Sequence, residues 1–330
     1  MKQINYESEV HIDNRNFLEK FLEKVAPKKF EGIDWARWKR KNLTLGGLGR
    51  FCWAIVRAII IIGICFMILY PFLVKIIVSF MSTNDLTDKT VMFIPREGST
   101  YFIERAIMNM NYWPALLNSS LLSLVVSIFQ LIVSLLVGYG FARFNFWGKN
   151  ILFVIVIVTL IIPPQTIMLP LYVQFRFFLG GINIIDTFWP LAIMSATGLG
   201  LKNGLYIYLM RQFFRGMPKE LEQSAYIDGA GPFRTFVSIM VPNAFNMMIT
   251  VFLFSFTWQW TDTTYNSMLM PELVVLSNTL FKVTKGVEDV LQQQTLLDTG
   301  SLLMIAPLLL VFLFAQRYFV QGIERSGLVG

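Results

Sequence analysis

The sequence predicts an all-α integral membrane protein with six transmembrane helices, and three observations lead to this fold class. Of its 330 residues, 55% are hydrophobic and only 15% are charged. Apolar runs of about 20 residues, the length that crosses a bilayer as a helix, recur along the chain. Basic residues gather in alternate connecting segments, which is typical of a chain that crosses a membrane repeatedly.

The six predicted spans follow the apolar runs. They cover residues 53–79, 116–140, 151–176, 188–209, 243–263 and 301–319. With the N-terminus inside, the inner segments hold nineteen Lys or Arg and the outer segments hold five. Because positively charged segments tend to stay in the cytoplasm, we expect both termini and the loop 211–242 to be cytoplasmic.

The chain divides into a basic N-terminal extension, residues 1–50, and a transmembrane domain, residues 51–330. The extension holds eleven Lys or Arg. Its apolar residues recur at helical spacing, so it is either a short interfacial helix anchored by Trp35 and Trp38 or a disordered tail. We expect no cleavable signal peptide, because about fifty mostly polar residues precede the first span.

Several classes of function are disfavoured by what the chain contains. The net charge is +7, but the basic residues gather in the inner segments, as membrane orientation requires. A nucleic-acid partner is therefore not expected. No G-x-x-x-x-G-K segment is present, and His11 is the only histidine. We therefore expect no ATP hydrolysis, no metal and no cofactor in this chain. Cys52 and Cys65 would lie about 20 Å apart on one helix, too far for a disulfide.

Residues 217–242 are predicted to form a compact helical hairpin outside the lipid. Pro218 suits a first helical position, and Glu222 favours the positive end of the helix dipole. Gly229 suits a left-handed helix end, and Pro232 can begin a second helix. The first helix would be only about 16 Å long, so it cannot span a bilayer. A rigid amphipathic element at this surface suits docking to a cytoplasmic partner.

Within this hairpin, the segment LEQSAYIDGA at 221–230 resembles the EAA loop in the membrane subunits of binding-protein-dependent ABC importers. In that family the loop carries the coupling helix, which sits in a cleft of the ATPase subunit. The usual Glu-Ala-Ala is replaced here by Gln, Ser and Ala at 223–225, so the contact of that glutamate is not transferred. The resemblance implies that the coupling residues are Glu222, Ser224, Ala225, Asp228, Gly229 and Ala230.

Three further segments resemble the carbohydrate branch of the same family, including maltose-type permeases. They are Asn118–Ser119, Pro164–Tyr172 and the ending Gln316–Phe319. The resemblance covers about residues 110–330 and implies the type I ABC importer fold, with 51–330 as the permease domain. The lysine that usually ends the family's C-terminal tail is missing here, so the family's tail contacts are not assigned to residues of this chain.

Polar residues within or beside the spans are candidates for a substrate path. Pro163, Pro164 and Pro170 predict a broken third span, which would turn Gln165 and Thr166 toward the interior. Other interpretations stay open. The break in the third span could be a packing kink, Lys202 could snorkel to the membrane surface, and the tryptophans of the fifth span could form an aromatic belt. A serine and glutamine stripe on the second span either packs or lines water. The path candidates are Asn118, Gln165, Lys202, Asn203, Gln259, Trp260 and Asp262.

The resemblance implies one subunit of a sugar importer in the cell membrane of a prokaryote, working by alternating access. ATP and Mg would be bound by partner ATPase subunits, two in number. The other implied partners are a second related permease, an extracytoplasmic sugar-binding protein and membrane lipid. Two alternatives remain: a secondary transporter coupled to an ion gradient, and a membrane scaffold that transports nothing.

Overall fold

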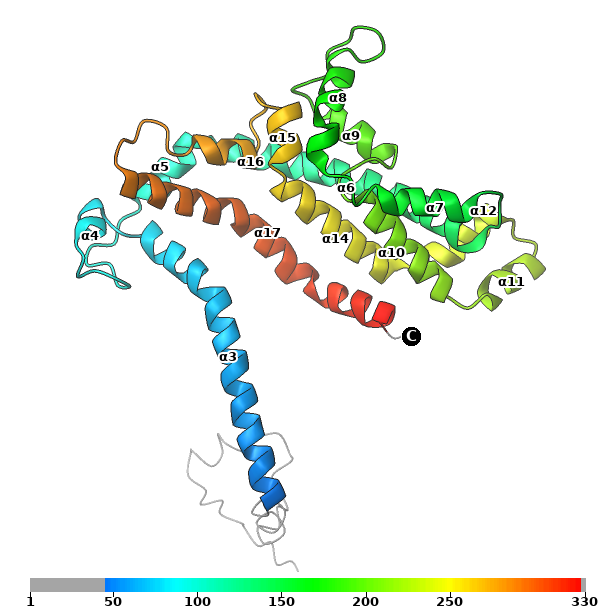
Figure 1. Cartoon of the computed structure of the whole chain (residues 1–330), viewed down its shortest axis with the longest axis horizontal. Coiled ribbons are helices and arrows are strands. Elements are labelled where there is room, and N and C mark those ends of the chain that lie inside the picture. The colour runs from blue at the N-terminus through cyan, green and yellow to red at the C-terminus, as the bar shows by residue number, and fades with distance from the viewer. Residues whose placement is uncertain (1–44, 328–330) are drawn as a thin grey trace, which may run out of the picture. The chain divides into compact units, whose positions relative to one another are not determined.

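The structure is a computed structural model that describes residues 45–327 (Figure 1). Most of the predicted extension 1–50, including Trp35 and Trp38, lies outside the described residues. The chain separates into two units, residues 1–70 and 71–330. The helix α3 (Leu45–Ser79) continues across that boundary, and the second unit contains all the other helices that the structure describes.

Every regular element in the described part of the chain is helical, which confirms the predicted all-α class. The longest helices are α3, α6 (Tyr112–Arg143), α14 (Phe245–Thr261) and α17 (Val290–Gly327). The shorter α-helices are α4 (Thr83–Thr87), α5 (Tyr101–Asn109), α7 (Lys149–Val158), α8 (Pro164–Arg176), α9 (Trp189–Ala196), α10 (Asn203–Gly216), α11 (Glu220–Ile227), α12 (Pro232–Thr235), α13 (Val241–Asn243), α15 (Thr264–Leu269) and α16 (Leu276–Thr279).

Three helical segments are long and apolar enough to cross a membrane: Phe51–Ser79, Tyr112–Arg143 and Val290–Gln316. A fourth crossing is possible where Pro232–Asn243 and Phe245–Thr261 meet at a bend of 77°. The two other predicted spans, 151–176 and 188–209, are each divided into two short helices. The count of six spans therefore stays a prediction.

The predicted break in the third span is present between the end of α7 at Val158 and the start of α8 at Pro164. Gln165 and Thr166 are both exposed on the surface of this chain, and their turn toward an interior stays a prediction. The Thr166 hydroxyl donates to the Pro163 carbonyl at 2.7 Å.

The fourth predicted span, 188–209, is also broken, which the sequence interpretation missed. The helix α9 ends at Ala196 and α10 begins at Asn203. Between them, Gly198 and Lys202 have positive φ values of 82° and 59°. Left-handed backbone cannot continue a right-handed helix, so the chain turns here.

The helix α6 packs against α10 and α14 (Figure 1). Ser123, Ser127, Gln130 and Ser134 of its polar stripe are buried. Gln130 is fully buried, donates from its amide to the Leu201 carbonyl at 3.1 Å and accepts a hydrogen bond from Ser255. The stripe therefore packs between helices, which was one of the two interpretations left open.

The last predicted span, 301–319, lies inside a longer helix, because α17 begins at Val290. The predicted outer loop 264–300 also contains α15 and α16. Hydropathy misses the first turns of α17, because polar groups there have internal partners. Asp298 forms an ion pair with Lys75, and the Thr299 hydroxyl donates to Ser79 at 3.0 Å.

Candidate functional site

The hairpin predicted at 217–242 is present as α11, a turn and α12. Gly229 has a φ of 77° and is the left-handed residue that ends the first helix. The Gly229 amide donates to the Tyr226 carbonyl at 3.1 Å, and the Ala230 amide donates to Ala225 at 2.9 Å. Pro232 is the first residue of α12, as predicted. These bonds make the turn rigid.

The second arm of the hairpin is more complex than one helix. After α12 the backbone becomes a π-helix, η1 (Phe236–Met240), and then α13, which continues past Pro242 to Asn243. The chain bends by 77° at Ala244 and enters α14. The second arm of the hairpin and α14 therefore form the bent pair that together is long and apolar enough for one crossing, with no extended loop between them.

Glu222 anchors the hairpin to the C-terminal end of α6. Its buried carboxylate accepts a hydrogen bond from the Tyr139 hydroxyl at 2.8 Å and lies 3.2 Å from Nε of Arg143. Arg143 also donates from Nη2 to the Met217 carbonyl at 2.9 Å. One carboxylate thus fixes α11 to both a phenol and a guanidinium on α6.

The ring of Tyr139 is held in turn by aromatic side chains from three segments. Its centroid lies 5.5 Å from that of Phe144, 5.5 Å from that of Phe214 and 4.7 Å from that of Phe236. Offset or edge-on pairs at these distances are favourable. The end of α6, the end of α10 and η1 therefore form one packed unit around the anchor.

The six predicted coupling residues divide into two groups. Glu222 and Ala225 are buried against the rest of the chain, whereas Ser224, Asp228 and Gly229 are exposed and Ala230 is half-buried. Sequence reasoning missed Ile227 and Phe233, whose side chains are 86% and 75% exposed at the tip of the hairpin. Both are large apolar residues on short, otherwise polar helices, and this pattern could have indicated from the sequence that they are exposed.

A cavity of about 490 Å³ lies where the breaks of the third and fourth predicted spans face each other. Its lining is mostly apolar, with Pro163, Pro164 and Leu201 among the contributors. Two of the predicted path residues, Lys202 and Asn203, line it, and Gln174, Thr159 and Tyr265 add polar groups. A concave, mainly apolar site with a few polar groups is typical of ligand binding.

Asn203 is almost fully buried, and neither atom of its amide has a hydrogen-bond partner among the described residues. An unpaired buried amide is unfavourable and calls for a partner inside the cavity. Lys202 is half-buried, and its Nζ lies 5.2 Å from the centre of the Trp258 ring. This cation–π contact takes the place of the snorkelling expected for Lys202.

Residues 130–325 match the family described as binding-protein-dependent transport system inner membrane component. The chain belongs to this family. It is a multi-pass membrane permease subunit of an ABC importer, and ATP is hydrolysed on a separate subunit. A permease of this kind works with ATPase and binding-protein partners.

Curated relatives and a solved structure agree with this membership. The arabinooligosaccharides transport system permease protein AraQ of Halalkalibacterium halodurans is 29% identical, over 81% of this chain and 93% of AraQ. A probable ABC transporter permease of Pyrococcus horikoshii is 33% identical, over 62% of this chain and 71% of that relative. A chain of a bacterial ABC transporter involved in the import of alginate has the same fold, with a TM-score of 0.69 and 19% identity. The match covers 82% of this chain and 98% of that chain.

The other predicted path residues of this permease do not line the cavity. The Trp260 indole donates to the Met304 carbonyl at 3.0 Å, and the Gln259 amide donates to Asn266 at 3.1 Å; both side chains are buried. The α14–α15 corner and α17 use these polar atoms internally, and a path role for the two residues stays a prediction.

The remaining three path candidates, Asp262, Asn118 and Gln165, do not line the cavity either. Asp262 accepts hydrogen bonds from two backbone amides at the start of α15, each at 3.0 Å. The Asn118 amide donates to the Val274 carbonyl at 2.9 Å, and Gln165 is exposed. Of the seven predicted path residues, only Lys202 and Asn203 meet at one cavity.

Proposed function

We propose that this permease imports a carbohydrate by ATP-driven alternating access, and that the hairpin α11–α12 is where an ATPase subunit docks. The observation that carries the docking proposal is the anchored hairpin. Its tip is exposed, while Glu222 ties its base to Tyr139 and Arg143. A force applied at the tip would reach α6 through this base without first deforming a flexible loop.

The exposed tip has the chemistry of a docking surface. Tyr226, Ile227 and Phe233 present large apolar side chains to solvent. Exposed apolar groups at a rigid helical element are typical of a protein–protein contact. We propose that they enter a cleft of the ATPase, with Ser224 and Asp228 at the rim.

The proposed assembly has two ATPase subunits, a second related permease and an extracytoplasmic sugar-binding protein. The excess of Lys and Arg in the inner segments supports cytoplasmic placement of both termini and of the hairpin. The sugar class rests on the arabinooligosaccharide transport named for the AraQ relative. The transport assay described below identifies which sugar is carried.

Lys202 and Asn203 are proposed to contribute to the substrate path. The unpaired Asn203 amide could exchange hydrogen bonds with a sugar hydroxyl, because it has both donor and acceptor atoms. The apolar lining around it could contact the C–H faces of a sugar ring. The cation of Lys202 would favour an acidic sugar over a neutral one.

The docking proposal is tested by co-purification. The double variant Ile227→Glu/Phe233→Glu places charges on the tip and should release the ATPase from the detergent-solubilised complex. The matched control is Phe281→Glu, which changes a residue that is 67% exposed on η2 (Leu280–Lys282), far along the chain. Full retention of the ATPase by the double variant would overturn the docking proposal.

The transport proposal is tested with the complete complex in proteoliposomes that contain the binding protein. We expect uptake of labelled arabino-oligosaccharide to require ATP on the ATPase side and to survive ionophores. Uptake that stops when an ion gradient is collapsed, with ATP present, would favour the secondary transporter. Association without any sugar uptake or sugar-stimulated ATP hydrolysis would favour a scaffold.

A further inference from the structure

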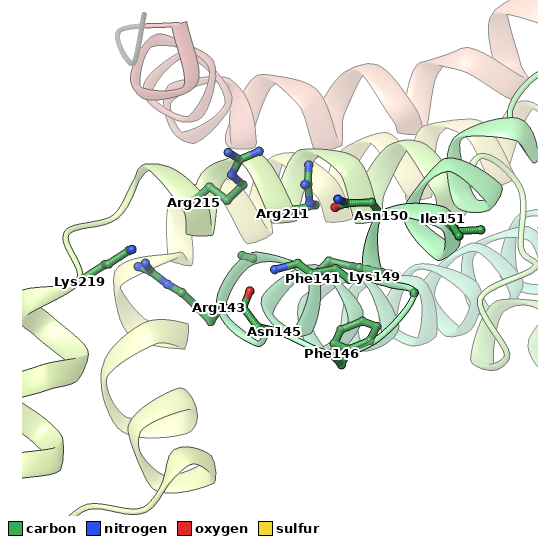
Figure 2. A pocket seen from close by; sticks show the side chains of 12 residues that line it. Phe141, Arg143, Asn145, Phe146, Lys149, Asn150, Ile151, Arg211, Arg215 and Lys219 are labelled. Atoms are coloured by element: carbon green, nitrogen blue, oxygen red, sulfur yellow. The ribbon is translucent and has the colours of Figure 1, made fainter.

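A second cavity, separate from the one proposed for the path, is lined by five cations and by no acidic residue. It has a volume of about 860 Å³ and lies between the end of α6, the loop before α7 and the end of α10 (Figure 2). Five basic residues line it: Arg143, Lys149, Arg211, Arg215 and Lys219. None of its twelve lining residues is Asp or Glu.

Four of these cations have no carboxylate partner in the part of the chain that the structure describes. Arg143 is paired with Glu222, but no ion pair is formed by Lys149, Arg211, Arg215 or Lys219. Lys149 donates to the Phe144 carbonyl at 2.7 Å, and the Arg211 guanidinium lies 3.8 Å from the centre of the Phe153 ring. The cavity therefore has a positive charge that residues 45–327 do not neutralise.

The like charges are close enough to affect one another. Burial, followed by the positive charges of Arg211 and Arg215, lowers the pKa of Lys149. Burial and the charge of Arg215 likewise lower the pKa of Arg211. An anion bound between them would relieve this repulsion.

The surface beside the cavity is apolar and faces outward. Trp147, in the loop before α7, is 96% exposed, and Phe146 at the cavity wall is also exposed. The helix α7 has no buried residue, although it is almost wholly apolar. Indole rings and unpaired apolar helix faces are typical of the boundary between headgroups and acyl chains.

We propose that this basic cavity binds a phosphate-bearing anion, namely the headgroup of an anionic phospholipid whose acyl chains lie along α7. Basic pockets at the cytoplasmic ends of membrane helices have this chemistry. A soluble phosphate would use the same cations but would have no need of the apolar wall. The leaflet is the cytoplasmic one, an assignment that rests on the proposed orientation of the importer.

The test is native mass spectrometry of the full-chain complex in detergent, with phosphatidylglycerol and phosphatidylcholine added in equal amounts. We expect the wild type to retain phosphatidylglycerol preferentially. The variant Arg211→Gln/Arg215→Gln should weaken that retention roughly tenfold or more, because two cations near a headgroup are lost. The exposed pair Arg215→Gln/Lys219→Gln should show the same effect without any change to buried packing.

The matched control is Lys282→Gln/Lys285→Gln, which removes two exposed cations that do not line the cavity. Equal retention of the two lipids by the wild type, or an equal loss in this control, would overturn the proposal. Displacement of phosphatidylglycerol by millimolar inorganic phosphate would assign the cavity to a soluble anion. Release of the ATPase with unchanged lipid retention would assign it to a protein contact.

The readout needs neither sugar nor ATP. Preferential lipid retention can therefore be found even if carbohydrate uptake is absent, and carbohydrate uptake can be found without it. The two proposals fail separately.

Discussion

The Tyr139 hydroxyl donates a hydrogen bond to Oε1 of Glu222 at 2.8 Å, although the two residues are 83 positions apart. The other carboxylate oxygen faces Arg143 at 3.2 Å. A buried carboxylate is tolerated only when both oxygens have such partners. The α11–α12 hairpin and α6 are therefore joined at a point where separation would leave buried charges unpaired.

Replacing Glu222 should damage both stability and coupling. In Glu222→Ala the buried Arg143 loses its counter-charge, which should cost about 3 kcal/mol or more. Thermal unfolding of the purified complex should show a lower midpoint, and substrate-stimulated ATPase activity should fall. The control is Glu220→Gln, an exposed residue of the same helix, which should behave like the wild type. Equal effects of the two variants would contradict the anchor.

The left-handed turn at Gly229 should not tolerate a side chain, for a reason of backbone conformation alone. A Cβ added there would meet nothing within 4 Å, but the φ of 77° disfavours other residues by about 1–2 kcal/mol. We expect Gly229→Ala to reduce coupled ATPase activity and Gly229→Asn to reduce it less.

Gly231→Ala is the matched control for the turn. Gly231 is also open to solvent, but its φ is −76°, which any residue adopts. It should therefore retain wild-type activity. Similar activity in Gly229→Ala and Gly231→Ala would show that the turn conformation is not needed for coupling.

The crossing of α6 and α10 depends on Gly138. A Cβ at this position would lie 2.6 Å from Cβ of Met210 and 3.0 Å from the backbone nitrogen of Arg211. Gly138→Ala must push the helices apart, and we expect a lower unfolding temperature and less folded protein after purification. Gly140→Ala, two residues along the same helix and with nothing within 4 Å, should be neutral or stabilising by up to about 1 kcal/mol. A neutral Gly138→Ala would be inconsistent with this close packing.

The ion pair between Lys75 and Asp298 connects the end of α3 to the first turns of α17. Both side chains are partly exposed, so loss of one partner in Asp298→Asn should destabilise the protein by about 1–3 kcal/mol. The reversed pair Lys75→Asp/Asp298→Lys should restore most of that loss in a thermal-unfolding double-mutant cycle. Additive losses in the two single variants, with no recovery in the double variant, would rule out the pair as a stabilising contact.

The class of the protein, the hairpin at 217–242 and the break in the third span could all be predicted from the sequence. Each depends on local properties: the length of apolar runs, the fixed φ of Pro163 and Pro164, and the conformational freedom of Gly229. Such properties act within a few residues of where they occur. A single sequence displays them directly.

Only the tertiary structure decided which polar groups have partners. Glu222 could not be matched to Tyr139 from sequence, and Trp260 and Gln259 were expected at a path before the structure placed them in the core. Four cations at the second cavity have no carboxylate partner among residues 45–327, and they likewise come from α7, α10 and Lys219 beside α11. The physical reason is that burial and charge pairing depend on contacts between distant segments, and these exist only once the helices pack.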